Sequence, residues 1–206
     1  MEYRAHRLGG MCAGAILATS IYGTRYFSLE NPDYKVAIGT LVLVTAGAIG
    51  SLMPDIDHPN SYISKQSPIL SFFVKIFLGL SRIVTKIILS LCFWISKRRK
   101  EAILAGTNHR GIFHTLLMVI AMYFLFGLIG MFIPDYGRLI QLGFTGGYLS
   151  HIMVDMLTKG GVMLLYPIVT VKFHWPFIRL TTGKHEGIAM VTIIFTTIIS
   201  ILYLLK

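Results

Sequence analysis

Five apolar runs are long enough, or nearly so, to cross a lipid bilayer as helices. A transmembrane helix needs about 20 apolar residues, and the candidate spans are 8–24, 36–53, 112–133, 139–157 and 188–205. The first two runs are short and rich in Gly and Ala, which favours close helix–helix packing. Hydrophobic residues make up 54% of the 206 residues and charged residues 14%, whereas soluble domains carry about a quarter charged residues. The sequence therefore predicts an all-α, polytopic membrane helical bundle of one domain, 1–206, with about five transmembrane spans.

A basic insertion, 66–105, separates the second and third spans. Its segment 69–95 is apolar overall but carries Lys75, Arg82 and Lys86, and spacings of seven and four place these cations on one helical face. Because cations across the bilayer centre are costly, we expect an amphipathic helix or a helical hairpin in the membrane interface. A helix that spans the membrane here stays open as an alternative.

Two other features limit the fold. Segment 160–180 contains two prolines and many β-branched and aromatic residues, which predicts an irregular or partly extended interfacial stretch. Cys12 and Cys92 both lie in apolar runs, so neither a disulfide framework nor a cysteine-based zinc site is expected.

The basic residues favour one orientation of the five spans. With the N-terminus in the cytoplasm, the far side holds only Arg25, Lys35, Arg138 and Lys206 of the 19 Lys and Arg residues. The positive-inside rule favours this arrangement. The net charge of +10 suits an anionic membrane surface or a phosphate-bearing substrate. A nucleic-acid partner is not expected, because the basic residues lie between apolar spans and no nucleic-acid-binding motif is present.

Nine candidate metal ligands fall on the cytoplasmic side of this topology. They are His6, Asp55, Asp57, His58, His109, His114, His151, Asp155 and Glu186. The far side holds no histidine and only three acidic residues. Because separate structural roles would scatter such residues over both faces, we expect the helix ends to bring them into one cluster.

Each part of this pattern also has a structural interpretation. Pro54 with the residues after it could simply end a helix. His151 and Asp155 are four residues apart on one helix face and could form a buried hydrogen bond. By itself, His6 is typical of an interfacial histidine, and Glu186 of an acidic helix N-terminus. The shared side of the membrane favours the metal-binding interpretation.

Three stretches carry a resemblance to a known family. LMPDIDHPNS (52–61), HRGIFHTLL (109–117) and GYLSHIMVDMLTKGGVMLLYP (147–167) together resemble the YdjM-like family of LexA-regulated, inner-membrane-associated metal-dependent hydrolases. The resemblance covers roughly 1–190 and implies a multi-pass inner-membrane hydrolase with its active site facing the cytoplasm. The family pattern maps onto His6, Asp55, Asp57, His58, His109, Arg110, His114, His151 and Asp155, and more loosely onto Glu186.

The ligand set predicts the chemistry. Seven or more His and carboxylate ligands exceed the need of one ion, so we expect two or three divalent ions, zinc first, with manganese or iron as alternatives. Such ions suit hydrolysis of a lipid phosphoester. Asp57 or Asp155 would bridge the ions, His58 or a carboxylate would orient the water, and Arg110 would bind the phosphate.

Other functions fit the same ligands. A metal-dependent lipid deacylase or amidase would use the ions on a carboxyl ester or amide. A non-catalytic, metal-stabilised membrane scaffold would bind metal without an open coordination position. A metal transporter is disfavoured, because it needs ligands along a permeation route and not at one face.

Overall fold

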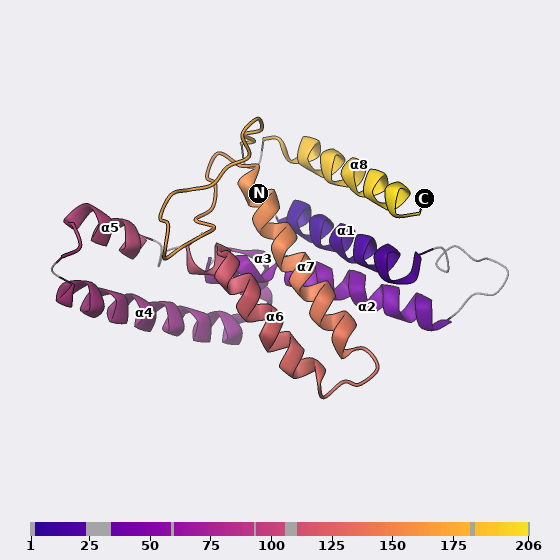
Figure 1. The fold of residues 1–206 in the computed structure, drawn as a ribbon, viewed down its shortest axis with the longest axis horizontal. Coiled ribbons are helices and arrows are strands. Elements are labelled where there is room, and N and C mark those ends of the chain that lie inside the picture. The colour runs from indigo at the N-terminus through magenta and orange to yellow at the C-terminus, as the bar shows by residue number, and fades with distance from the viewer. Residues whose placement is uncertain are drawn as a thin grey trace.

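The computed structural model describes residues 3–23, 34–58, 60–92, 94–105, 111–181 and 184–205. These residues are mainly helical (Figure 1), which confirms the prediction of an all-α protein. The order along the chain is α1 (Tyr3–Tyr22), α2 (Tyr34–Gly50), the 3-10 turn η2 (Met53–Asp57), α3 (Tyr62–Gln66), α4 (Pro68–Leu91), α5 (Lys97–Ala105), the 3-10 turn η3 (Ile112–His114), α6 (Leu116–Gly130), α7 (Gly137–Met156) and α8 (Glu186–Leu204).

Helices α1, α2 and α7 form the centre of the bundle, and each packs against the other two. Glycine lets their backbones touch. A Cβ atom on Gly47 would lie 2.3 Å from the carbonyl oxygen of Gly10, and one on Gly147 would lie 2.0 Å from the carbonyl oxygen of Gly47. No side chain fits at such distances, so these contacts require glycine. The Gly-rich character of the first two predicted spans therefore serves helix packing, as the sequence indicates.

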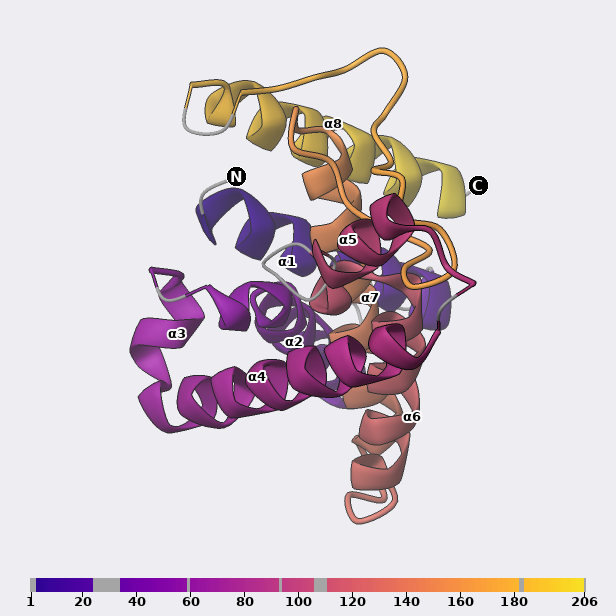
Figure 2. The same ribbon diagram turned by 90° about the vertical axis from the view of Figure 1, so that its left-hand side faces the viewer.

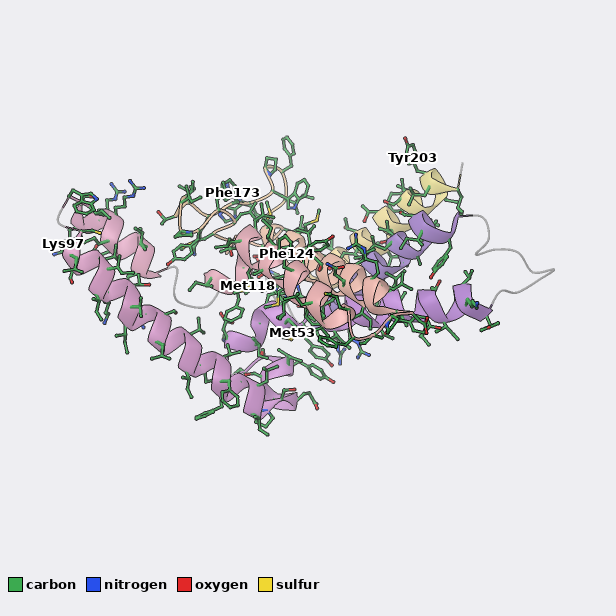
Figure 3. The ribbon with its side chains drawn as sticks, turned by 60° about the horizontal axis from the view of Figure 1, so that its bottom comes forward. Met53, Lys97, Met118, Phe124, Phe173 and Tyr203 are labelled. Atoms are coloured by element: carbon green, nitrogen blue, oxygen red, sulfur yellow. The ribbon has the colours of Figure 1, made fainter. Side chains whose placement is uncertain are left out.

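One face of α7 carries three large side chains of the core. Phe144, Tyr148 and Ile152 recur every four residues and are all buried, as expected for one helical face. Met53 and Met118 pack against this cluster, and both lie near the middle of the molecule in Figure 3. The core is thus continuous with η2 and α6, the elements that flank the predicted ligand residues.

Two helical segments in the described part of the chain are long and apolar enough to cross a membrane. They are Tyr34–Asp57, which includes α2, and α8. Helix α6 is also apolar but has 15 residues. The remaining spans of the five-span topology, and its orientation, stay predictions.

The basic insertion forms a helical arm. For segment 69–95 the sequence predicts an amphipathic helix or a helical hairpin. The structure has one continuous helix, α4, over most of this segment, and the helix extends away from the bundle (Figure 1). Lys75, Arg82 and Lys86 are exposed, as are many of its apolar side chains. The chain turns back after α4 into α5, and Lys97 lies at the far end of this arm (Figure 3). The amphipathic helix is as predicted, and its place in the membrane interface stays a prediction.

An irregular segment connects α7 to α8, as expected for 160–180. It runs over one end of the molecule in Figure 2 and makes two isolated β-bridges, Thr158 with Leu180 and Val162 with Phe173. The hydroxyl of Tyr166 donates a hydrogen bond of 2.9 Å to the backbone oxygen of Ile103 on α5. Burial raises the pKa of Tyr166 above its usual value, so this donor keeps its proton at neutral pH. The segment thereby connects the arm to the end of the bundle.

Candidate metal centre

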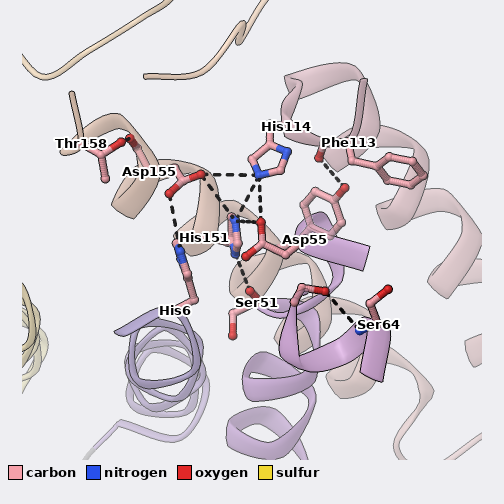
Figure 4. A network of polar contacts seen from close by, with 11 residues as sticks. His6, Ser51, Asp55, Ser64, Phe113, His114, His151, Asp155 and Thr158 are labelled. Carbon is pink, nitrogen blue, oxygen red and sulfur yellow. Dashed lines mark hydrogen bonds and ion pairs between the residues drawn. The ribbon is translucent and has the colours of Figure 1, made fainter. Parts of the chain in front are cut away.

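Five polar side chains from four elements converge at one end of the bundle (Figure 4). They are His6 on α1, Asp55 on η2, His114 on η3, and His151 and Asp155 on α7. They form two overlapping groups that share His151, one with His6 and Asp155 and the other with Asp55 and His114. Within each group, one ligand atom per residue lies within 4.8 Å of the others.

Helix α7 supplies two of these side chains from a single face. His151 and Asp155 are one turn apart, and Nε2 of His151 lies 3.8 Å from Oδ2 of Asp155. The helix ends directly after them, and the Thr158 hydroxyl donates a 2.7 Å bond to the backbone oxygen of Asp155. The spacing of the pair is therefore set by the local geometry of one helix.

The turn after α2 supplies Asp55. Pro54 stands at the start of this turn, where the missing N–H of proline has no helical partner to lose. The turn directs Oδ1 of Asp55 to within 3.5 Å of His114 Nε2 and 3.6 Å of His151 Nε2. One carboxylate oxygen thus faces two imidazole nitrogens.

The turn that carries His114 is tied to α7 by a buried hydrogen bond. The hydroxyl of Tyr148 donates to the backbone oxygen of Phe113 at 2.6 Å. The next residue, Thr115, caps α6 by accepting a bond from the Met118 N–H. His114 is thus held between a capped helix start and the buried face of α7.

A backbone contact sets the tautomer of His151. Its Nδ1 atom lies 2.6 Å from the carbonyl oxygen of Ser51. Because a carbonyl can only accept, Nδ1 carries the proton and the Nε2 lone pair of the neutral ring points into the cluster. Metal-binding histidines commonly show this arrangement, in which the second ring nitrogen donates to a backbone oxygen.

Asp155 faces different histidines with its two oxygens. Oδ1 lies 3.5 Å from Nε2 of His6, and Oδ2 lies 3.5 Å from Nε2 of His114. The His6 ring stacks on that of His151, with centroids 3.7 Å apart and planes at 15°. This carboxylate therefore lies between His6 on one side and the other two histidines on the other.

Burial makes the two carboxylates depend on positive partners. The three histidines and Asp155 are at most 1% exposed, whereas Asp55 is 23% exposed at its side chain. A carboxylate away from water is costly unless a cation or hydrogen bonds compensate it. Imidazole nitrogens and carboxylate oxygens without thiolates are a donor set that zinc, manganese and iron accept. The residues present therefore fit a divalent metal site that opens at Asp55.

The YdjM inner membrane protein family matches the chain over residues 1–206. The chain belongs to this family. The resemblance stated from the three sequence motifs is therefore confirmed. Membership also places the protein in the inner membrane.

Named relatives agree with this assignment. The chain is 35% identical over 128 residues to the inner membrane protein YdjM of Escherichia coli K12, and equally to that of Shigella flexneri. These matches cover 61% of this chain and 49% of each relative, so the chain matches about half the length of those proteins. It is 27% identical over 157 residues to the protein YvsG of Bacillus subtilis 168, with 76% of both chains covered. No solved structure matches.

Five further residues predicted in this YdjM-family chain lie elsewhere or outside the described part. Asp57 is buried on the same turn as Asp55, but neither group of converging ligand atoms includes it. A 3-10 turn has about three residues per turn, so side chains two residues apart point in different directions. His109 and Arg110 lie outside the described residues, and their roles stay predictions.

The remaining two predicted residues are also not members of the described groups. His58 follows the turn, and its Nδ1 accepts a bond of 3.3 Å from the backbone N–H of Asn60. Glu186 begins α8, as expected for an acidic residue at a helix N-terminus. Their binding roles also stay predictions.

Sequence reasoning did not find the residues that orient the ligands. Ser51 contributes only its backbone oxygen, which has no sequence signature. Tyr148 stands three residues before His151 within the quoted GYLSHIMVD motif, and a hydroxyl on an otherwise apolar helix face is a signal that could have identified it.

Proposed function

We propose that this protein is a membrane-bound, metal-dependent hydrolase that cleaves a phosphoester bond of a lipid at the cytoplasmic interface of the inner membrane. The observation that supports it best is the placement of Asp155 between His6 and the His114–His151 pair. A carboxylate with one oxygen toward each side is suited to bridge two ions.

The ligands divide naturally between two ions. His6 and Oδ1 of Asp155 would contribute to one ion, and His114, His151, Asp55 and Oδ2 of Asp155 to the other. The side chain of Asp55 is the partly exposed part of the cluster, so water and substrate would enter there. Zinc is the first choice for this donor set, with manganese and iron as alternatives.

Divalent ions held at these residues would lower the pKa of a bound water and neutralise charge on the phosphoryl oxygens. Asp57, on the turn that also carries Asp55, would accept a proton from the attacking water. As the water oxygen bonds to phosphorus, the bond from phosphorus to the alcohol oxygen breaks and a proton returns to that oxygen. We assign Asp57 and His58 to orienting the water, and Arg110 to binding the phosphate.

The basic arm supports a lipid substrate. Lys75, Arg82 and Lys86 are exposed on α4, next to apolar side chains that are exposed as well. Basic and apolar residues on one amphipathic helix bind anionic membrane surfaces. This arm would attract anionic lipid to the face of the membrane at which the metal centre is predicted to lie.

Purified protein and mixed phospholipids test the proposal directly. We expect release of a phosphate-bearing headgroup or of phosphate in the presence of zinc or manganese, loss of release with chelator, and recovery when metal is restored. Asp155→Asn should abolish both metal binding and release, whereas Asp135→Asn, an exposed acidic position at the opposite end of the bundle, should leave both unchanged. Release of fatty acid in place of these products would identify the deacylase alternative.

The near-complete burial of four of the five ligands also favours the metal-stabilised scaffold as a second candidate. Protein loaded with Co²⁺ separates the two. An enzyme with an open coordination position should change its visible spectrum when phosphate or vanadate is added, because an added ligand alters the cobalt geometry. A scaffold should bind cobalt, unfold when it is removed, and show no spectral response to either anion.

A further inference from the structure

An apolar groove runs beside the metal centre. It has a volume of about 580 Å³ and lies between α1, α7 and α8. At one end it is lined by Gly9, one turn beyond His6, and by Val154, the residue before Asp155. On α1 the lining continues to Leu17, and eight residues of helix extend about 12 Å. The groove therefore passes the depth of the ligands. On α1 it follows the direction of the bundle away from them, and Leu157 extends its lining past Asp155.

The lining of the groove is mainly apolar. Its lining residues include no charged side chain. The hydroxyls of Ser150, Thr192 and Thr197 donate to the backbone oxygens of Gly147, Ile188 and Ile193 within their own helices. Because these donors already have partners, they add little polarity to the lining. A hydrocarbon chain is the ligand that matches such a surface.

The position of the groove favours a lipid chain as its occupant. One wall belongs to α8, a candidate membrane span, so the groove faces the region in which the hydrocarbon chains of a bilayer lie. An extended acyl chain is the apolar ligand that reaches such a groove.

We propose that this groove holds one acyl chain of the lipid whose phosphoester lies at the metal centre. The proposal rests on the proposed function, because the occupant is the substrate of that site. The groove places the hydrocarbon along apolar helix α8, a candidate membrane span. The lipid headgroup would then lie at the ligand end, on the same side as the basic arm.

Tryptophan fluorescence can report the occupant. Trp175 lines the groove, and Trp94 is the other of the two tryptophans in the chain. In a Trp94→Phe background in detergent micelles, phosphatidylglycerol brominated on its acyl chain should quench Trp175 in a saturable manner at a small fraction of the micelle lipid. A Trp175→Phe protein, which keeps only Trp94, should show only weak quenching that rises linearly with lipid.

A filled groove should lose this signal. Ala13 lines the groove, whereas Ala15 is on the same helix, is also half-buried, and is not a lining residue. Ala13→Leu should reduce the saturable quenching at least threefold, and Ala15→Leu should retain it. Thr196→Leu, on the exposed surface of α8 and in the lining, repeats the test from the opposite wall if Ala13→Leu folds poorly. Saturable quenching unchanged in both groove variants, or purely linear quenching in the parent, would overturn the proposal.

The Asp155→Asn variant separates this inference from the hydrolase. It should lose metal and keep the saturable quenching, because Asp155 does not line the groove. A parent protein that binds and hydrolyses lipid without saturable quenching would refute the groove alone. A parent that shows the quenching but neither metal binding nor hydrolysis would refute the hydrolase and leave a lipid-binding groove.

Discussion

The Nε2 atoms of His114 and His151 lie 3.3 Å apart, although the two rings come from separate elements. Because Nδ1 of His151 donates to Ser51, its Nε2 is an acceptor. Either His114 donates a proton to it or a cation lies between the two nitrogens. The two nearby carboxylates favour a cation, and this relationship underlies the predictions below.

His6 and His114 should bind different metal ions. If Asp155 bridges two ions, His6→Ala removes a ligand of one ion only and should lower the bound metal from about two ions per chain to about one. His114→Ala removes a ligand of the other ion and should retain at most the ion next to His6. Plasma mass spectrometry of purified protein measures both. Full occupancy in either variant would exclude that histidine from the centre.

Asp55 and Asp57 should contribute unequally. Asp55 faces two histidines, whereas Asp57 belongs to neither described group. We expect Asp55→Asn to weaken metal binding by at least tenfold, comparable to the loss of a direct ligand, and Asp57→Asn to have the smaller effect. Competition with a chromogenic chelator gives both affinities. A larger effect at Asp57 would assign the direct ligand to that residue, as the sequence also allows.

The Tyr148 hydroxyl should stabilise the turn that carries His114 without binding metal itself. Tyr148→Phe leaves the buried Phe113 oxygen without this bond and should reduce the free energy of unfolding by about 1–3 kcal/mol. Metal affinity should fall roughly tenfold or more, because residues that orient ligands commonly have effects of that size. Tyr123→Phe is the matched control, since the Tyr123 hydroxyl accepts its bond from Arg138 at an exposed position. Equal effects in denaturant unfolding of the two variants would contradict this role.

Gly147 should tolerate no side chain. A Cβ atom there would lie 2.0 Å from the Gly47 carbonyl oxygen, so Gly147→Ala must separate α2 from α7 and should cost about 1–3 kcal/mol or more. In α4, Gly79→Ala meets no atom within 4 Å and should be neutral or stabilising by up to about 1 kcal/mol. Thermal unfolding in one detergent compares them, and an unfolding temperature for Gly147→Ala equal to that of the parent would refute the close helix contact.

The predicted orientation can be measured with single cysteines. In a protein whose Cys12 and Cys92 are replaced by Ser, Arg98→Cys on the arm should react with a membrane-impermeant maleimide only when the cytoplasmic face is accessible. Tyr34→Cys, exposed at the opposite end of the bundle, should react from the outside of intact cells. The reverse pattern would invert the topology and place the metal centre on the outer face.

Local sequence patterns predict the fold class and part of the candidate metal site. The spacing of His151 and Asp155, the helix stop at Pro54 and the glycines of the first two apolar runs are properties of short segments. Helix geometry converts each of them directly into a position in space. The family pattern follows from the same short motifs, which is why the sequence supported both the fold class and the family.

The packing of segments that are distant in the chain decides which predicted residues meet at the site and where the groove forms. Whether Asp55 or Asp57 faces the histidines depends on how one 3-10 turn is oriented against α7, and the stacking of His6 on His151 depends on the contact between α1 and α7. The groove beside the metal centre exists because small residues on α1 and α7 lie opposite α8. These outcomes come from the packing of segments that are distant in the chain, and hydrophobic periodicity carries no information on how such segments meet.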